Sequence, residues 1–581
     1  MPARPVAVVA VFAAVAVAAP ARAADPIMPL SQVRKGMKCT GLSVVQGTDI
    51  SSFDVEVLDV VAGDESARQP LILVRVSGPA VDSTGIAEGF SGSPVICPDD
   101  DGVQRFAGAI AFASGDYGGH VALATPIESV LGLPVDPPKD TRRNARAARH
   151  ARPLAMPLAV AGLSAPVAAG FRRIAARAHR RLSTAPFAPI TSAFPPQEIR
   201  PGASLAVGMA SGDVTAGAVG TVTYVDGAKV WGFGHPFDAV GRRDLLLKDA
   251  YVYTVIGNPV GIADAVSQKL AAPGHDLGTI TDDGPNGVAG RLGALPPRIP
   301  VRVDARDADT GERQSVDVQV ADETPAGQPS GGSGLSLIGP MALSQAAFSV
   351  LESSPARLSG SMCVSIAVRE RDKPMHFCNT YVGAGGGPQS DNPDDSAVPA
   401  GVMAGDFGDA LSELDGYRFG VLHVTSVRAR LTVERGLRQA YLVRGRAPRV
   451  VRRGRRVGVH LVLQRAFGHR LRRTISVRIP RDAPLGRRTL VLIGTPADEG
   501  GGGDAGAVVD LTSALDGGGG DDGAGPRSVA ALARRIAHLH RYDGVRLSLV
   551  RPGDRPGHGT KAYRDPNLRL TGRVRLPVVV T

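Results

Sequence analysis

Short runs of alternating or continuous apolar residues, separated by turn-forming residues, dominate the first part of the chain. The segments 53–61 (FDVEVLDVV), 71–76 (LILVRV) and 105–113 (RFAGAIAFA) are rich in β-branched and small apolar residues, and this predicts three strands. The segment 124–133 (ATPIESVLGL) opens with Thr-Pro, which predicts a short helix. The pattern therefore indicates a β unit that ends in a helical turn.

A second β unit follows a basic segment. Residues 167–182 have helical periodicity with arginines on the polar side, and 219–237 (VGTVTYVDGAKVWGFGHPF) contains Asp226-Gly227 between two alternating runs. Asp-Gly in that position is a strong signal for a β-hairpin. Strands of period two continue beyond residue 300, and 528–541 (SVAALARRIAHLHR) predicts a final helix.

The chain has 581 residues, which is too long for a single hydrophobic core, so several units are expected. Short, evenly spaced strands near residues 420–494 favour an immunoglobulin-like sandwich. The predicted organisation is a signal peptide (1–24), a serine-bearing β half-domain (25–135), a basic linker and helix (136–195), a histidine-bearing β half-domain (196–305), a β extension (306–383), a linker (384–402), a β-sandwich (403–495), a Gly/Asp-rich linker (496–526) and a C-terminal helix with strands (527–581).

The first residues have the pattern of an export signal. Arg4 precedes an apolar run of about fifteen residues, shorter than a membrane span needs, and Ala21-Arg22-Ala23 fits signal peptidase cleavage. We expect a secreted, periplasmic or cell-envelope protein, with no transmembrane span after cleavage.

Four cysteines agree with an oxidising compartment. We predict the disulfides Cys39–Cys97 and Cys363–Cys378, the second between two strands joined by a turn. A four-thiolate zinc site is the alternative, but it lacks C-x-x-C spacing. No metal or organic cofactor is expected.

The net charge of +11 arises from an excess of arginine. The runs 142–152 (RRNARAARHAR) and 450–457 (VVRRGRRV) are its densest parts, yet no nucleic-acid-binding motif or row of stacking aromatics accompanies them. We therefore expect no nucleic-acid partner, and interpret the runs as solvated linkers or surfaces, with contact to the cell envelope possible.

The segment 89–97 (GFSGSPVIC) is a candidate nucleophile loop. Gly89 and Gly92 flank Ser91 and leave its hydroxyl uncrowded in a sharp bend, as acyl transfer by a serine requires. An ordinary β-turn has the same composition.

His235 is the candidate general base. It follows the predicted hairpin between Gly234 and Pro236, where the backbone is constrained and uncrowded. The chain has 12 histidines, and spacing alone does not exclude His120 or His275.

Three segments together resemble the SpoIVB peptidase family, secreted bacterial serine peptidases of the trypsin-like clan. GIAEGFSGSPVI with FAGAIAFA and ATPIESVL is similar to the family's nucleophile region, GTVTYVDGAKVWGFGHPF to its histidine segment, and GTITDDGPNGVAGRLG (278–293) to a third segment. The resemblance covers about residues 29–300.

The resemblance implies a trypsin-like double β-barrel with Ser91 as nucleophile and His235 as general base. The amides of Gly89 and Ser91 would form the oxyanion hole, and Ser93 would support the turn.

Two features depart from the family pattern. The serine segment precedes the histidine segment here, which implies half-domains in permuted order. Gly78 occupies about the position of the family's acid; Asp82 is the nearest carboxylate, and Asp283 and Asp213 are alternatives in the histidine unit.

These observations lead us to expect a secreted serine endopeptidase acting on a protein or peptide substrate, with self-processing as one option. The alternative is a non-catalytic envelope or extracellular interaction protein on a degenerate peptidase scaffold. An α/β-hydrolase is disfavoured because Ser93 stands where G-x-S-x-G needs glycine.

Overall fold

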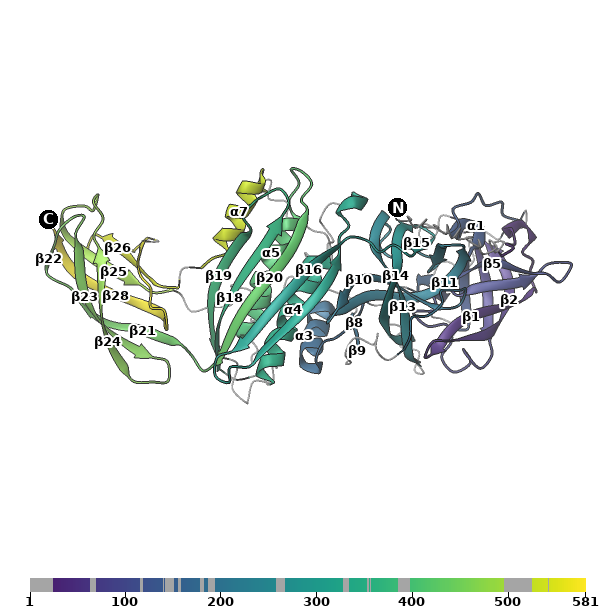
Figure 1. Cartoon of the computed structure of the whole chain (residues 1–581), viewed down its shortest axis with the longest axis horizontal. Helices are drawn as coiled ribbons and strands as arrows, with labels where there is room; N and C mark the ends of the chain where they lie inside the picture. Colours follow the sequence, from purple (N-terminus) through teal and green to yellow (C-terminus); the bar gives the residue numbers. More distant parts are fainter. Residues whose placement is uncertain are drawn as a thin grey trace, which may run out of the picture.

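The computed structural model describes residues 25–62, 69–114, 119–138, 141, 151–154, 158–177, 182–185, 194–257, 267–327, 334–352, 355, 357–384, 398–495, 525–541, 543–557 and 559–581. The fold is mainly β, as expected, and the units follow one another along an elongated molecule (Figure 1). The predicted signal peptide lies outside the described residues, as does most of the 142–152 run.

The first unit is a closed barrel of six strands. The pairing order β4-β1-β2-β3-β6-β5 is closed by β4–β5, and β7 extends β5 at its edge. The elements are β1 Lys38–Gln46, β2 Asp49–Val61, β3 Leu71–Ser77, β4 Pro94–Pro98, β5 Gln104–Ser114, β6 Val121–Pro126, α1 Ile127–Val130 and β7 Ala151–Pro153. The three predicted strands are confirmed as parts of β2, β3 and β5, and the predicted short helix is the single turn α1.

A second ring of six strands follows, because β10–β11 closes the path β10-β13-β14-β15-β12-β11. The Asp226-Gly227 hairpin is confirmed, since Gly227 has a φ of +57° between β11 and β12. The elements are β8 Leu158–Ala161, α3 Ala165–Arg177, β9 Leu182–Ala185, β10 Ser204–Gly212, β11 Thr215–Asp226, β12 Lys229–Gly232, β13 Gly241–Ile256, β14 Gln268–Gly284 and β15 Gly287–Leu292.

The middle unit extends this sheet through the pairing of β10 with β17 and covers it with helices. Its core joins the sheet to α4, α5 and α7. The elements are β16 Arg298–Asp307, β17 Arg313–Ala321, α4 Gly334–Leu351, β18 Arg357–Val368, β19 Met375–Ala384, α5 Val398–Asp415, β20 Val424–Arg435 and α7 Val529–His538.

The sequence did not predict α4 or α5. Helix α4 has the length and apolar composition of a membrane span, but 78% of it is buried within the protein. Helix α5 and strand β20 also change the expected sandwich over 403–495, because β20 pairs with β16 and β18 of the middle unit.

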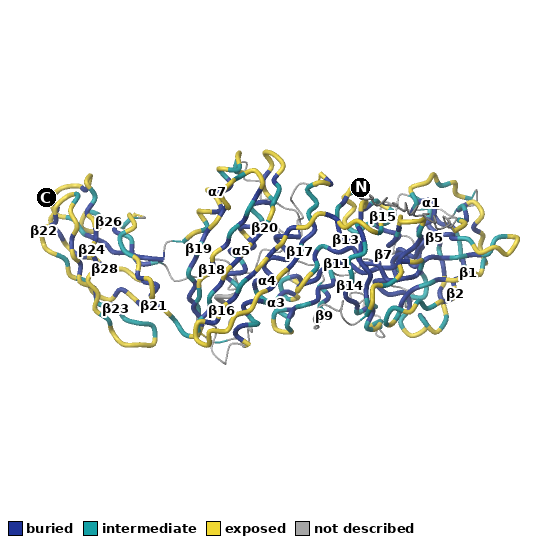
Figure 2. The backbone as a smooth tube through the Cα atoms, viewed as in Figure 1, coloured by how far each residue is buried: buried dark blue, intermediate teal, exposed yellow. Residues whose placement is uncertain are grey.

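The C-terminal unit is therefore built from β21 onward and completed by the last residues. Its eight strands pair in the order β24-β23-β21-β28-β25-β26-β27, with β22 on β28, around a core of its own. The strands are β21 Gln439–Arg446, β22 Val450–Val451, β23 Arg456–Arg465, β24 Arg470–Arg478, β25 Gly486–Ile493, β26 Val545–Val550, β27 Thr560–Tyr563 and β28 Arg569–Val580. Figure 2 shows buried backbone in this unit and, more densely, where the two barrels meet.

Both predicted disulfides are present. Cys39–Cys97 joins β1 to β4 and Cys363–Cys378 joins β18 to β19. The described residues include no free cysteine.

Candidate active site

The Ser91 loop lies between β3 and β4 and needs its glycines. Gly89 and Gly92 have φ values of +93° and +91°, a region that favours glycine. A Cβ atom at Gly92 would lie 2.0 Å from the carbonyl oxygen of Thr221 and 2.4 Å from the amide nitrogen of Phe233. The glycine therefore allows the loop to touch the second barrel.

Strand β11 of the second barrel binds the loop at three of its carbonyls. The amide of Thr221 donates to the Ser91 carbonyl (2.8 Å), and its hydroxyl donates to that of Gly89 (3.1 Å). The hydroxyl of Thr223 donates to the Gly92 carbonyl (2.8 Å). The two barrels therefore meet at the loop that carries Ser91.

The amides of Gly89 and Ser91 have no hydrogen-bond acceptor among the described residues, whereas those of Phe90 and Gly92 are bonded. An oxyanion hole requires unpaired amide donors of this kind close to the nucleophile. The predicted roles of these two amides are thus compatible with the loop's hydrogen bonding.

His235 lies three residues after β12, in a loop with unusual backbone angles. Phe233 and Gly234 have φ values of +71° and +67°, and a Cβ atom at Gly234 would lie 3.0 Å from that of Ala109 in β5. The imidazole is 2% exposed. Its Nδ1 lies 2.8 Å from the carbonyl oxygen of Pro236, which assigns the proton to Nδ1 and leaves Nε2 as an acceptor.

Nε2 of His235 is buried and has no hydrogen-bond partner among the described residues. Burial is the main influence on the ring and lowers the pKa of His235, against smaller opposing effects of the Pro236 and Leu154 backbone and of Asp283. The imidazole is therefore neutral at neutral pH, the state that accepts a proton.

The carboxylate of Asp283 lies close enough to influence His235, but its hydrogen bonds go elsewhere. It accepts from the amides of Phe237 and Asp238, both at 2.7 Å, and lies 3.6 Å from Arg243 Nη1. Asp283 therefore fixes the chain that follows His235 rather than bonding to the imidazole.

The other predicted acids do not bond to the imidazole. Asp82 is exposed and accepts from the amide of Gly78 (2.7 Å), while Asp213 accepts from that of Asp317 (2.8 Å). Among the described residues, no hydrogen bond or ion pair joins Asp82 or Asp213 to His235.

Of the alternative histidines, His275 has a structural setting. Its Nδ1 lies 3.0 Å from a carboxylate oxygen of Asp249, and its ring packs edge-on against Phe194. Neither His275 nor His120 has a hydrogen bond to Ser91 in the described chain.

The serine and histidine segments share a contact surface on β5. The amide of Gly92 donates to the Ile110 carbonyl (2.8 Å), and Gly234 packs on Ala109 and Ala111. No hydrogen bond joins Ser91 to His235 in the described part of the chain, and Ser91 is only 1% exposed. Both segments thus contact β5, and both side chains are covered.

Lys269, at the start of β14, is a buried residue of this site that sequence reasoning missed. Its ammonium donates to the hydroxyls of Ser43 (2.8 Å) and Thr221 (3.5 Å) and lies 4.5 Å from the centre of the Phe90 ring. Its amide donates to the Glu88 carbonyl (2.9 Å). Burial lowers the pKa of Lys269 to about 7.

The signal that could have found Lys269 is its place in the sequence. Lys269 directly precedes the apolar run Leu270-Ala271-Ala272, and lysine is rarely buried without a carboxylate. Only the fold places it under the Ser91 loop.

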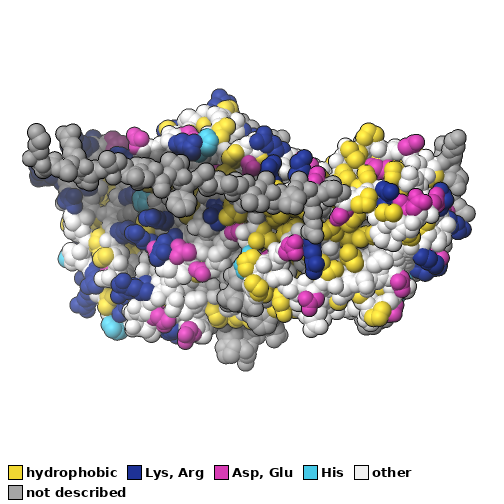
Figure 3. Space-filling model, turned by 45° about the vertical axis from the view of Figure 1, so that its right-hand side comes forward, with side chains coloured by type: hydrophobic (Ala, Val, Ile, Leu, Met, Phe, Trp, Pro, Cys, Tyr) yellow, Lys and Arg dark blue, Asp and Glu magenta, His cyan; other side chains and the backbone are white. Residues whose placement is uncertain are grey.

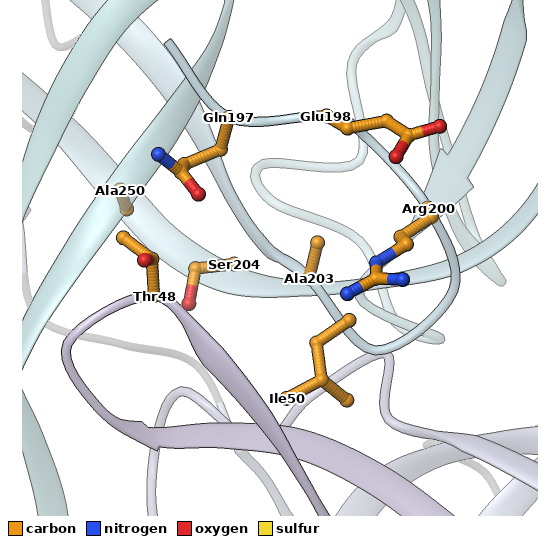
Figure 4. A pocket seen from close by; sticks show the side chains of 8 residues that line it. All are labelled: Thr48, Ile50, Gln197, Glu198, Arg200, Ala203, Ser204 and Ala250. Carbon is orange, nitrogen blue, oxygen red and sulfur yellow. The ribbon is translucent and has the colours of Figure 1, made fainter. Parts of the chain in front are cut away.

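A pocket of about 240 Å³ lies where the β1–β2 hairpin meets the second barrel (Figure 4). Ser204 lines this pocket, and its buried hydroxyl has no hydrogen-bond partner among the described residues. In the β10–β11 pair, Ser204 lies opposite Thr221. Arg200 turns its guanidinium toward Ile50, whereas the Glu198 carboxylate points away. Polar atoms dominate the lining of the pocket. Thr221 lies on β11, the strand that pairs with β10, which carries Ser204.

No group of three or more His, Cys, Asp or Glu side chains could hold a metal ion within the described ranges.

In comparisons with known proteins, no family model, no curated protein and no solved structure matches this chain.

Proposed function

We propose that the two barrels form a SpoIVB-like serine endopeptidase module of trypsin-like architecture, with its half-domains in permuted order. One observation carries the proposal: the glycine-bounded Ser91 loop packs against the segment of His235, whose neutral imidazole has no partner at Nε2 in the part of the chain that the structure describes. The resemblance of three separate segments to that family agrees with this juxtaposition.

The proposed reaction is acyl transfer. Ser91 Oγ attacks the carbonyl carbon of a peptide while Nε2 of His235 takes the hydroxyl proton. The carbonyl oxygen, now negative, accepts hydrogen bonds from the amides of Gly89 and Ser91. His235 then gives the proton to the leaving amine, and water hydrolyses the acyl-enzyme by the same route.

The proposal requires the covering segments to move. Ser91 and His235 are almost completely buried, and the backbone of Leu154, just after β7, lies beside the imidazole. A peptide therefore reaches Ser91 only when this edge of the first barrel opens. In the closed arrangement the Pro236 carbonyl, not a carboxylate, holds the imidazole tautomer.

Labelling of the full chain with a fluorophosphonate tests the proposal. We expect one covalent adduct, located on Ser91 by peptide mass spectrometry. Ser91→Ala should abolish it and His235→Gln should slow it at least a hundredfold, because general-base catalysis contributes about 10² to 10⁴ in rate.

Ser93→Ala is the matched control. Ser93 is two residues away and fully buried, and its hydroxyl has no partner among the described residues, so its removal should leave the labelling rate within about twofold. A folded wild-type protein that takes no label, or a label that persists in Ser91→Ala, would refute the peptidase proposal.

The second candidate is a non-catalytic envelope or extracellular interaction protein on the same scaffold. It is favoured by the lack of any described carboxylate bonded to His235 and by the burial of Ser91. Absence of labelling in well-folded protein would support it.

A further inference from the structure

Positive charge is concentrated in the C-terminal unit. Residues 437–495 and 543–581 contain 24 Lys and Arg against 4 Asp and Glu, a net charge of +20. The whole chain carries only +11, so the remainder sums to −9. The segment 141–197 is a second basic part of the chain, with ten arginines and no Asp or Glu, but the C-terminal unit carries the larger positive charge.

The charge is dense at the end of this unit that lies farthest from the barrels. We call residues 447–456, 479–488 and 577–581 the distal end. They lie together, since β22 pairs with the end of β28, β25 begins beside it, and the amide of Arg453 donates to the Thr581 carbonyl (3.0 Å). Figure 1 shows β22 and the C-terminus at the left-hand end of the molecule.

The distal end contains eight arginines and one acidic side chain, that of Asp482. Arg449, Arg452, Arg455 and Arg487 are exposed, and the described residues give their side chains no carboxylate partner. In Figure 3, Lys and Arg side chains are frequent toward the left-hand side, where this unit lies. Such unpaired like charges repel one another, and an anionic surface would neutralise them.

Apolar side chains are exposed among these arginines. Val450, Leu485 and Val579 are 57%, 55% and 37% exposed. Val450 and Val579 are neighbours in the β22–β28 pair, Val579 also pairs with Arg487, and Leu485 precedes Gly486, the partner of Val580. The three side chains thus form one apolar patch within the cationic end.

We propose that the distal end docks on an anionic lipid bilayer. Its arginines would contact lipid phosphates and Val450, Leu485 and Val579 would enter the interfacial layer, because binding of this kind combines apolar burial with electrostatic attraction. The aliphatic parts of the arginine side chains suit the same boundary. Docking at this end holds the two barrels away from the bilayer, at the other end of the molecule (Figure 1).

A bilayer fits these observations better than a hydrated polyanion. A polysaccharide gives exposed valine and leucine no apolar surface to join. The three segments of the distal end contain no Phe, Tyr or Trp, so bases of a single-stranded nucleic acid would have no aromatic ring to stack on.

Sedimentation of the full chain with vesicles tests the inference independently of the peptidase proposal. With phosphatidylcholine vesicles containing 30% phosphatidylglycerol in about 0.1 M NaCl, we expect binding at least tenfold stronger than with phosphatidylcholine alone. At about 0.5 M NaCl, binding should weaken at least tenfold because salt screens the charges.

Variants at exposed positions locate the surface. Arg452→Gln/Arg455→Gln/Arg487→Gln should weaken binding roughly a hundredfold, since each arginine near an anionic surface contributes about fivefold. Leu485→Ser should weaken it several-fold at both salt concentrations, because it removes apolar burial without changing charge.

The control removes the same charge from exposed positions outside the distal end, Arg291→Gln/Arg313→Gln/Arg428→Gln, and should bind like wild type. Equal loss in this control, equal binding to uncharged vesicles, or binding to polygalacturonate or duplex DNA but not to the anionic vesicles would overturn the inference. Circular dichroism checks that each variant is folded.

Discussion

At the scale of single residues, the site depends on groups that tolerate little change. Gly92 must lack a side chain to reach Thr221, and the hydroxyl of Thr221 lies between the Gly89 carbonyl and the Lys269 ammonium. Lys269 is a buried cation whose only polar side-chain partners among the described residues are hydroxyls. We therefore expect its protonation to affect the stability of the Ser91 loop.

Lys269 gives a prediction about stability. Its pKa is about 7 in the folded protein and near 10.5 when unfolded, so between these values the unfolded state binds more protons and stability rises with pH. The slope of the unfolding free energy against pH should approach roughly 1 kcal/mol per pH unit. At pH values below 7, Lys269 is charged in the folded protein as well, and the whole free-energy cost of burying that charge is present.

Lys269→Met should lack this rise in stability with pH. The measurement is the unfolding free energy of both proteins from pH 6 to 10, compared as wild type minus variant. The exposed Lys229→Met is the control and should retain the rise. A wild-type slope that survives in Lys269→Met would contradict the assignment.

At the scale of elements, closure of the first barrel depends on a short contact. Strands β1 and β4 pair at only two positions, Thr40↔Ile96 and Gly41↔Val95, and Cys39–Cys97 lies directly beside them. By contrast, Cys363–Cys378 lies within the long β18–β19 pair, which is already held by ten paired positions.

We therefore expect the two disulfides to differ in effect. Their sequence separations are 58 and 15 residues, so loop-closure entropy predicts losses of about 4 and about 3 kcal/mol when they are removed. Cys39→Ala/Cys97→Ala should be the more destabilising pair by about 1 kcal/mol in urea denaturation. A larger loss for Cys363→Ala/Cys378→Ala would show that the short β1–β4 contact closes the barrel without help.

At the scale of the whole molecule, the units have separate cores. The C-terminal unit has its own core, and the His235 segment packs on another that includes Leu246. The chain nevertheless enters the C-terminal unit at β21, leaves it after β25, contributes α7 to the middle unit and then returns at β26. These crossings mean that the C-terminal unit is not a simple appended segment.

Separate cores predict separate responses to mutation. Leu490→Ala, at a fully buried position in the C-terminal unit, should destabilise that unit by about 2 to 5 kcal/mol and leave fluorophosphonate labelling of Ser91 unchanged. Leu246→Ala should instead lower the stability of the second barrel and reduce labelling. Calorimetry with labelling at 25 °C distinguishes these outcomes; equal loss of labelling in both variants would mean that the units unfold together.

Apolar and alternating runs in the sequence predicted β2, β3 and β5 of the first barrel and the β11–β12 hairpin of the second. Alternate residues are buried in much of β2, whereas β11 is buried along nearly its whole length. The sequence pattern did not predict helix α4, because this helix is apolar on nearly every side and shows no helical periodicity. It failed also for α5, whose glycines and aspartates read as a linker and the start of a sandwich, although its apolar side packs on the middle sheet.

The sequence by itself determined the two disulfides, the Asp226-Gly227 hairpin and the segments of Ser91 and His235, because each is a local pattern of residue types. Only the tertiary structure decided that these two segments share the surface of β5, that Asp283 bonds to backbone amides and that Lys269 lies under the serine loop. These relations join residues far apart in the chain, and their geometry is set by how the two rings of strands pack. The concentration of arginine at one end of the molecule has the same origin, since β22, β25 and β28 meet there only after folding.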